Sequence, residues 1–252
     1  MVVPPYKATM PAKDNLKTTN GQHPDYKLLI FDFDGVLVDT QEVINEIQYN
    51  YLKKNFSIPI PFEMYTDKFS GMRMETIVEI LQQQQTMPLS VSPLSISQTI
   101  DDLVLEQLST QEISPLPGVV HFLKESTTKR CIGSNCSFKL LIAFLKASKL
   151  EDFFKGNVFS AEMVKHPKPA PDLFLYAAKK MSEKVKNCLV IEDSLVGIQA
   201  ARTACIDVVG FFGGSHVPPD ITEKLLQIGA KTVINDMRQL NSYLTLAQTL
   251  QG

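Results

Sequence analysis

Six short apolar runs constrain the fold of this chain more than any other feature of its sequence. They are YKLLIFDF (26–33), KRCIGSN (129–135), NVFS (157–160), NCLVIED (187–193), DVVGFF (207–212) and KTVIND (231–236). The first run is apolar on both faces and is followed by an Asp-Gly pair, which is typical of a strand buried on both sides. Amphipathic stretches lie among the later runs, at 138–148, 172–182, 194–204 and 221–229. Strands that alternate with helices predict an α/β fold, in which a parallel sheet is covered by helices on both faces.

One long segment interrupts this alternation. Between about residues 42 and 113 the apolar residues recur at helical spacing, as in EVINEIQYNYLKKNF and METIVEILQQQQ, and no strand pattern is convincing. We therefore expect an all-helical insert after the first strand. The expected division of the chain is an extended N-terminal arm at 1–25, an α/β core formed by 26–41 and 114–252, and the helical insert at 42–113.

The composition argues against several classes of partner and location. The chain has 252 residues, a formal net charge of −2 and no basic stretch, so we expect no nucleic-acid partner. No apolar run is long enough to cross a bilayer, and the N-terminus lacks a basic segment followed by an apolar one, so we expect no membrane association and no secretory signal.

The four cysteines form no CxxC pair and lie among apolar residues. They predict buried reduced thiols and a cytoplasmic protein.

Polar residues follow four of the predicted strands. They are Asp32 and Asp34 after the first run, Ser134 and Asn135 after the second, Lys168 after the third, and Glu192 and Asp193 after the fourth. Each has a structural alternative, because Asp-Gly is a common turn, serine and aspartate cap helices, and a loop lysine is usually solvated. The carboxyl ends of parallel strands nevertheless meet at one edge of a sheet. We therefore expect these groups to form one site.

The carboxylates of this cluster suit a hard cation. Asp32, Glu192 and Asp193 bring oxygen ligands together, and a divalent ion, most simply Mg²⁺, would offset their repulsion. No cluster of cysteine and histidine residues suggests a softer metal. Magnesium held by carboxylates commonly serves phosphate substrates, and a lysine and a serine hydroxyl are suitable donors to phosphoryl oxygens. One aspartate can then attack phosphorus while its neighbour handles the proton of the leaving group.

The order of these residues resembles the four motifs of the haloacid dehalogenase-like phosphatase superfamily. The matches are Asp32-Phe33-Asp34-Gly35-Val36 to the first motif, Ser134 to the second, Lys168 in KPAPD to the third, and Glu192-Asp193 in IEDSLVGIQAA to the fourth. DFDGVLVD, KPAPD and EDSLVGIQAA are similar to the branch that contains β-phosphoglucomutase and the sugar-phosphate phosphatases. The resemblance implies a Rossmann-like parallel sheet, with an all-helical cap domain inserted after the first motif. The segment 42–113 corresponds to that cap.

The resemblance also implies roles for the matching residues. Asp32 would be the nucleophile that forms an aspartyl-phosphate, and Asp34 would be the acid for the leaving group and then the base for water. Ser134 and Lys168 would bind the phosphoryl group. The remaining implied contacts are Mg²⁺ ligation by Asp32, the Asp34 carbonyl, Glu192 and Asp193, phosphate binding by the amides of Gly35 and Asn135, and a substrate contact from Arg73. The implied substrate is a small phosphorylated metabolite, either a sugar phosphate or a sugar-acid phosphate.

Three functions are consistent with this pattern: a Mg²⁺-dependent phosphatase, a phosphosugar mutase, and a non-catalytic binder of a phosphate ligand. Mutases of this branch carry a histidine twelve positions after the nucleophile, where this chain has Ile44, and that departure favours hydrolysis. Arg73 is either a substrate contact or a solvated helix-start residue. A pure binder would have no need of Asp34, which argues against the third function. Closure of a cap would require hinges, which we expect near 38–41 and 113–117.

Overall fold

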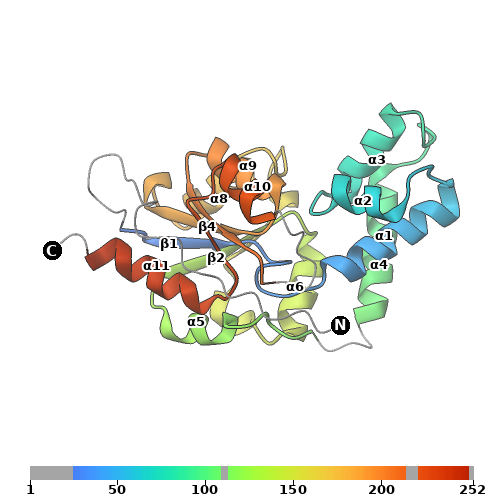
Figure 1. The fold of residues 1–252 in the computed structure, drawn as a ribbon. Helices are drawn as coiled ribbons and strands as arrows, with labels where there is room; N and C mark the ends of the chain where they lie inside the picture. Colours follow the sequence, from blue (N-terminus) through green and yellow to red (C-terminus); the bar gives the residue numbers. More distant parts are fainter. Residues whose placement is uncertain (1–24, 109–112, 214–220, 250–252) are drawn as a thin grey trace, which may run out of the picture.

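One parallel sheet lies at the centre of the protein (Figure 1), in a computed structural model that describes residues 25–108, 113–213 and 221–249. Its six strands follow the order β3-β2-β1-β4-β5-β6, and every neighbouring pair is parallel. The strands are β1 (Leu28–Phe31), β2 (Lys129–Ser134), β3 (Val158–Ser160), β4 (Cys188–Glu192), β5 (Asp207–Phe211) and β6 (Thr232–Ile234). The predicted α/β fold is therefore confirmed, and each of the six apolar runs contains one strand.

Strand β1 occupies the middle of the sheet, between β2 and β4. In register, Phe31 lies beside Ile132 on one neighbour and Ile191 on the other. Its side chains alternate between the two faces, so that Phe31 packs in one apolar layer and Ile30 in the other, both fully buried. Burial on both faces explains the unbroken apolar run, and it places the residues that follow Phe31 at the carboxyl edge of the sheet.

Helices cover both faces of the sheet (Figure 1). The helices α5 (Val119–Glu125), α6 (Phe138–Ala147), α7 (Glu151–Phe154) and α11 (Arg238–Thr249) lie on one face, and α8 (Asp172–Lys180), α9 (Leu195–Thr203) and α10 (Ile221–Ile228) lie on the other. Among the described residues, 3₁₀ turns occur at Ala161–Met163 and Val185–Asn187. On the first face the rings of Phe122 and Phe154 each meet Phe31 edge to face, with centroids 6.1 Å apart. Burying a side chain of this size contributes roughly 1.5–3 kcal/mol, so these contacts fix the layer firmly.

Four helices lie between β1 and α5 and project to one side of the sheet (Figure 1). They are α1 (Gln41–Phe56), α2 (Phe62–Phe69), α3 (Met74–Gln83) and α4 (Pro93–Leu108). The described part of the segment 42–113 contains helices and loops but no strand. Its interior is apolar and includes Tyr65, Phe69, Ile77 and Ile100, all almost fully buried. We refer to the helices α1–α4, with the loops that connect them, as the helical cap.

Two chain connections join the cap to the sheet, and they run side by side. Val38 forms an isolated antiparallel bridge with Pro115, and the Leu116 amide donates to the Leu37 carbonyl at 2.9 Å. Val38 also bridges to Asp34, one of the predicted site residues. The expected hinges fall on these connections. The domain boundaries and the hinges stay predictions, and the expected arm at 1–25 lies almost entirely outside the described residues.

The cysteines are free, but the expectation that all four are buried is wrong. Cys131 and Cys188 are buried within strands, and Cys136 is partly buried. Cys205 is exposed, because it occupies the turn that ends α9, where its backbone adopts a left-handed φ of 57° and its amide donates to Arg202. No helix among the described residues has the length and apolarity needed to cross a membrane.

Candidate active site

The first part of the site is the turn that follows β1. Asp32 is 8% exposed and Asp34 is 9% exposed, and the Asp32 amide still donates to Ile191 on β4 at 2.9 Å. Gly35 turns the chain with a φ of 76°, and a Cβ at that position would lie 1.9 Å from an Asp193 oxygen. Both the positive φ and the close approach of a carboxylate therefore require glycine here. The Gly35 amide donates to the Val38 carbonyl at 2.7 Å, so it does not offer the free donor that was predicted to bind phosphate.

Asp34 is held in place by Thr40. Its Oδ1 accepts hydrogen bonds from both the amide and the hydroxyl of Thr40, each at 2.9 Å. Burial raises the pKa of Asp34 to about 7, although the hydrogen bonds from Thr40 lower it. A carboxyl group with a pKa in this range can release a proton and take one back near neutral pH. Thr40 was not among the predicted site residues, although it stands only six positions after Asp34, in DGVLVDT.

The second part of the site is the end of β4. Glu192 is 1% exposed, and its Oε2 accepts from the amide and the hydroxyl of Ser194, each at 2.9 Å. The Ser194 hydroxyl also caps α9 by accepting from the Gly197 amide at 3.0 Å. A Cβ on Gly197 would lie 1.7 Å from Glu192 Oε1, so the start of α9 leaves room only for glycine. The end of this strand and the start of the helix therefore fix the Glu192 carboxylate.

Lys168 links the two acidic strand ends. Its Nζ lies 2.8 Å from Asp32 Oδ1 and 2.6 Å from Glu192 Oε1, and it stands 4.7 Å from the centre of the Phe174 ring. Lys168 is only 5% exposed. Burial lowers its pKa, but the charges of Asp32 and Glu192 raise it by more, and the pKa is above its ordinary value. The ammonium group is therefore charged in the folded protein.

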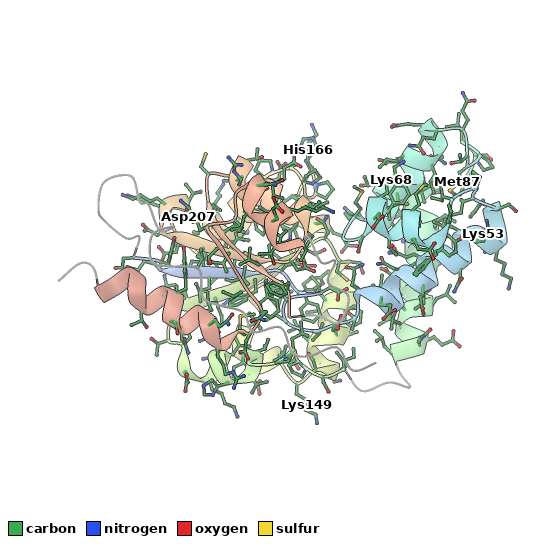
Figure 2. The ribbon with its side chains drawn as sticks, viewed as in Figure 1. Lys53, Lys68, Met87, Lys149, His166 and Asp207 are labelled. Atoms are coloured by element: carbon green, nitrogen blue, oxygen red, sulfur yellow. The ribbon has the colours of Figure 1, made fainter. Side chains whose placement is uncertain are left out.

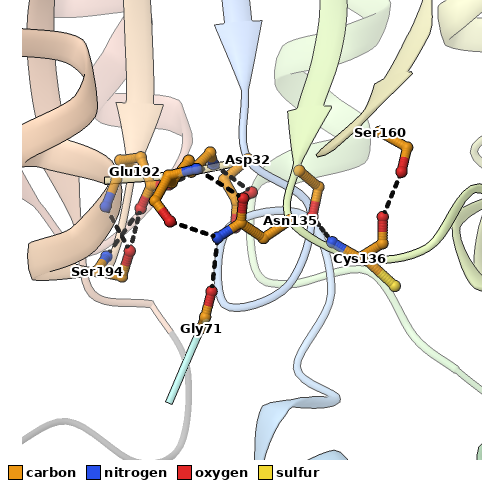
Figure 3. Close-up of polar contacts among 10 residues, drawn as sticks. Asp32, Gly71, Asn135, Cys136, Ser160, Glu192 and Ser194 are labelled. Atoms are coloured by element: carbon orange, nitrogen blue, oxygen red, sulfur yellow. Dashed lines mark hydrogen bonds and ion pairs between the residues drawn. The ribbon is translucent and has the colours of Figure 1, made fainter. Parts of the chain in front are cut away.

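The third part of the site is the end of β2, shown with the acidic strand ends in Figure 3. Ser134 is 3% exposed, and its hydroxyl accepts from the Cys136 amide at 3.2 Å. The Asn135 side chain donates to the carbonyls of Gly71 in the cap and of Lys168, at 3.1 and 3.2 Å, and accepts from the Lys168 amide at 3.0 Å. The Asn135 side chain therefore positions the Lys168 loop and the cap, and only its backbone amide is left for the predicted phosphate contact.

Asp32, Glu192 and Asp193 fit a divalent cation. Each offers a carboxylate oxygen, and these oxygens lie within 4.8 Å of one another. Burial raises the pKa of Asp193 well above its usual range, and the charges of Glu192, Asp32 and Asp34 raise it further. Burial likewise raises the pKa of Asp32 to about 6, against the opposing effect of Lys168. Such crowding of negative charge beside one lysine calls for a further cation, and an all-oxygen ligand set favours Mg²⁺.

A cleft of about 1050 Å³ lies between the sheet edge and the helical cap. All the predicted site residues line it: Asp32, Asp34, Gly35, Arg73, Ser134, Asn135, Lys168, Glu192 and Asp193. Arg73 precedes α3, and two of its guanidinium nitrogens donate to Glu75, at 2.6 and 3.2 Å. The structure therefore brings the core residues together around Lys168 and places Arg73 on the cap wall of the same cleft.

Two histidines, His166 and His216, follow the third and fifth apolar runs in the sequence. His166 is exposed and contacts Asp172 at 3.0 Å, and its side chain points away from the body of the protein (Figure 2). It does not line the cleft. His216 lies outside the described residues.

The chain is similar to several curated proteins and to several solved structures. It is 26% identical over 197 residues to the 6-phosphogluconate phosphatase of Escherichia coli (strain K12), covering 78% of this chain and 87% of the relative. It is 28% identical over 186 residues to the fructose-1-phosphate phosphatase of the same organism, covering 73% of this chain and 95% of the relative. A haloacid dehalogenase-like protein of unknown function from Agrobacterium tumefaciens is 34% identical, with a TM-score of 0.70, over 88% of this chain and 98% of that chain.

A family model matches the central part of the chain. The model is that of the haloacid dehalogenase-like hydrolases, and the match covers residues 29–211. This range includes the ends of β1, β2 and β4, the Lys168 loop and the entire helical cap. The chain therefore belongs to the haloacid dehalogenase-like hydrolase family.

Proposed function

We propose that this protein is a Mg²⁺-dependent phosphatase that hydrolyses a small phosphorylated metabolite through an aspartyl-phosphate intermediate. One observation carries the proposal. Asp32, the candidate nucleophile, and Asp34, the candidate acid and base, directly follow the central strand, and the Lys168 ammonium group contacts Asp32. The names of two relatives, a 6-phosphogluconate phosphatase and a fructose-1-phosphate phosphatase, support a sugar-type substrate.

In the first half-reaction a carboxylate oxygen of Asp32 attacks phosphorus, and the bond from phosphorus to the ester oxygen breaks. Asp34 gives its proton to that oxygen, so that the product leaves as an alcohol. The charged Lys168, the Ser134 hydroxyl and the Asn135 amide bind the phosphoryl oxygens. They stabilise the negative charge during the transfer, and their fixed positions avoid reorganisation at that moment.

In the second half-reaction Asp34 takes a proton from water, and the water oxygen attacks phosphorus. The bond between phosphorus and Asp32 breaks, which releases inorganic phosphate and restores both aspartates. Asp32, the Asp34 carbonyl, Glu192 and Asp193 would hold the magnesium ion, which supplies positive charge to the phosphoryl group when it is bound. The cap covers the cleft and limits access of bulk water during the transfer.

A phosphosugar mutase is the second candidate, because the same chemistry serves transfer to another sugar hydroxyl. Ile44 lines the cleft at the position where mutases of this branch carry a histidine. An apolar side chain there provides no hydrogen bond that would restrain attack by water, which favours hydrolysis. Conversion of β-glucose 1-phosphate to glucose 6-phosphate without matching release of phosphate would select the mutase.

Phosphate release tests the proposal directly. We expect turnover of one or a few phosphorylated sugars in the presence of Mg²⁺, loss of that turnover in EDTA, and recovery when Mg²⁺ is added back. The physical reason is that Lys168 alone cannot offset four crowded carboxylates together with an incoming phosphate dianion. Turnover that is unaffected by EDTA would contradict the assigned metal site, and Mg²⁺ binding without any turnover would favour a non-catalytic binder.

Replacing Asp34 with asparagine separates its chemical role from a structural one. We expect formation of the aspartyl-phosphate to slow by about 10²- to 10⁴-fold with a sugar phosphate, because its alkoxide leaving group needs the proton. The expected effect on the first half-reaction is smaller with p-nitrophenyl phosphate, whose leaving group needs little protonation. Pre-steady-state release of p-nitrophenolate measures that step. An equal loss with both substrates would assign Asp34 a structural role, as the partner of Thr40.

A further inference from the structure

The cap wall of the cleft carries an excess of negative charge. The segment 39–108 contributes six carboxylates to the lining and only two cations. The acidic residues are Asp39, Glu42, Glu63, Asp67, Glu75 and Asp101, and the basic ones are Lys68 and Arg73. The phosphate end of a substrate is held by the sheet edge, so the part of the substrate beyond the phosphate ester would face this wall.

Lys68 and Arg73 offset only part of the excess on this wall, and Lys224 on α10 also lines the cleft. Arg73 forms its ion pair with Glu75, and both side chains are less than one-fifth exposed, so the pair presents little net charge to the cleft. Lys68 is exposed and stands 5.1 Å from the centre of the Phe69 ring. Glu63 and Asp67 lie one helical turn apart on α2. No described residue forms an ion pair with either of them.

One buried polar side chain of the cap is directed into the cleft. Gln48 on α1 is 8% exposed, and its Oε1 accepts from the Tyr65 hydroxyl at 3.1 Å. No described residue accepts a hydrogen bond from its Nε2, and no fully buried side-chain nitrogen or oxygen of the described residues lacks a partner. Gln48 lines the cleft, and its amide nitrogen keeps some access to solvent, since every fully buried polar atom has a partner. A buried amide in this position is a built donor for a ligand oxygen.

Gln48 differs in this respect from its neighbour on the same helix. The Asn45 side chain is also buried, but it donates to the Ser70 hydroxyl at 3.2 Å and accepts from Gln41 at 2.9 Å. Its polar atoms are therefore satisfied by the cap itself. The amide nitrogen of Gln48 has no partner among the described residues and is therefore available to a substrate oxygen.

We propose that the part of the substrate beyond the phosphate ester is uncharged and rich in hydroxyl groups, as in a sugar or polyol monophosphate. This inference rests on the proposed function and narrows it. Hydroxyl groups can donate to the carboxylates of the cap wall and accept from Gln48, whereas a second anionic group would be repelled. Repulsion between charges of the same sign on the protein and on an unwanted ligand is an effective source of selectivity. Sugar-acid phosphates and bisphosphates are therefore poor substrates.

A matched pair of substrates tests the inference. Sorbitol 6-phosphate and 6-phosphogluconate are open chains of the same length that differ at C1, where one carries an alcohol and the other a carboxylate. We expect kcat/KM to be at least about tenfold higher for sorbitol 6-phosphate. We also expect the ratio to fall as the salt concentration rises from about 0.05 M to about 0.5 M, because screening weakens repulsion by exposed charges. Rejection by shape alone would not depend on salt.

Two sets of variants locate the effect. The double variant Glu63→Gln/Asp67→Asn should raise kcat/KM for 6-phosphogluconate by about threefold to tenfold and change that for sorbitol 6-phosphate little. The matched control is Glu46→Gln/Glu79→Gln, which removes two exposed carboxylates of the cap that do not line the cleft. The control should leave both values unchanged. Gln48→Leu should raise KM for sorbitol 6-phosphate by about tenfold, with a smaller effect on KM for p-nitrophenyl phosphate.

The outcomes separate this inference from the proposed function. If 6-phosphogluconate is hydrolysed as well as sorbitol 6-phosphate, or if the double variant and its control behave alike, the inference is wrong while the phosphatase stands. Failure to hydrolyse any ester, p-nitrophenyl phosphate included, in protein supplied with Mg²⁺ overturns the proposed function and the inference with it.

Discussion

Replacing Asp32 with asparagine is expected to abolish turnover, with a loss of kcat on the order of 10⁴- to 10⁶-fold. Asparagine has the same shape and can still accept a hydrogen bond from Lys168, which lies 2.8 Å from Asp32 Oδ1 in the structure. Its amide oxygen is a far weaker nucleophile than a carboxylate, so the covalent bond to phosphorus does not form. The measurement is kcat for phosphate release at saturating Mg²⁺ and saturating substrate.

The fold of the Asp32→Asn variant should survive, which distinguishes loss of chemistry from loss of structure. The substitution removes one of four crowded carboxylates, so the thermal unfolding midpoint should not fall. Asp152→Asn on α7 is a matched control, because this aspartate is exposed and lies outside the cleft lining. It should leave kcat unchanged. A kcat for Asp32→Asn within about tenfold of the unmodified protein would show that the nucleophile is another residue.

Replacing Lys168 with methionine should reduce both activity and stability. Methionine retains most of the apolar stem but removes the charge from a position where Lys168 is 5% exposed and contacts Asp32 and Glu192. Breaking a buried ion pair from one side costs about 3–5 kcal/mol, because the partner charge stays buried without compensation. Loss of one preorganised donor to the phosphoryl group lowers kcat by roughly 10²- to 10³-fold. Urea unfolding without Mg²⁺ and steady-state kinetics with Mg²⁺ measure the two effects.

A second lysine provides the control for that prediction. Lys139 on α6 is ion-paired with Asp102 at 2.6 Å, but both side chains are more than half exposed. Lys139→Met should therefore change the urea midpoint little, since water screens an exposed pair. Added Mg²⁺ should restore part of the stability of Lys168→Met and little of its activity. A loss of stability no larger than that of Lys139→Met would mean that the acidic strand ends do not depend on Lys168.

The core of the site could be predicted because topology alone brings its residues together. Asp32 and Glu192 end neighbouring parallel strands, and any parallel sheet places such residues at one edge. Lys168 also follows a strand, although β3 is not adjacent to β1 in the sheet. The strands could be predicted from the apolar runs, because a strand that is buried on both faces accepts few residue types other than apolar ones. The roles of these residues stay predictions until they are tested.

The cap wall could not be predicted from the sequence. Gln48, Glu63 and Asp67 look like ordinary polar positions of amphipathic helices, and their contact with the cleft depends on how α1 and α2 rotate against the sheet edge. The phosphate contact of the Asn135 amide stays a prediction. The contacts of its side chain with the cap and the Lys168 loop could not be predicted, because these segments are distant in the sequence. The exposure of Cys205 depends on a left-handed turn that an apolar neighbourhood does not reveal.

The pairing of the two connections between sheet and cap constrains how the cap can move. Val38 is bridged to Pro115 on one side and to Asp34 on the other, so the strip that carries the cap is continuous with the turn that carries the acid–base candidate. Two backbone segments that share hydrogen bonds can twist together more easily than they can slide apart. The predicted hinges therefore lie on one paired strip of backbone that leads directly to Asp34. We expect any rotation of the cap about this strip to change the orientation of the Asp34 carboxyl group.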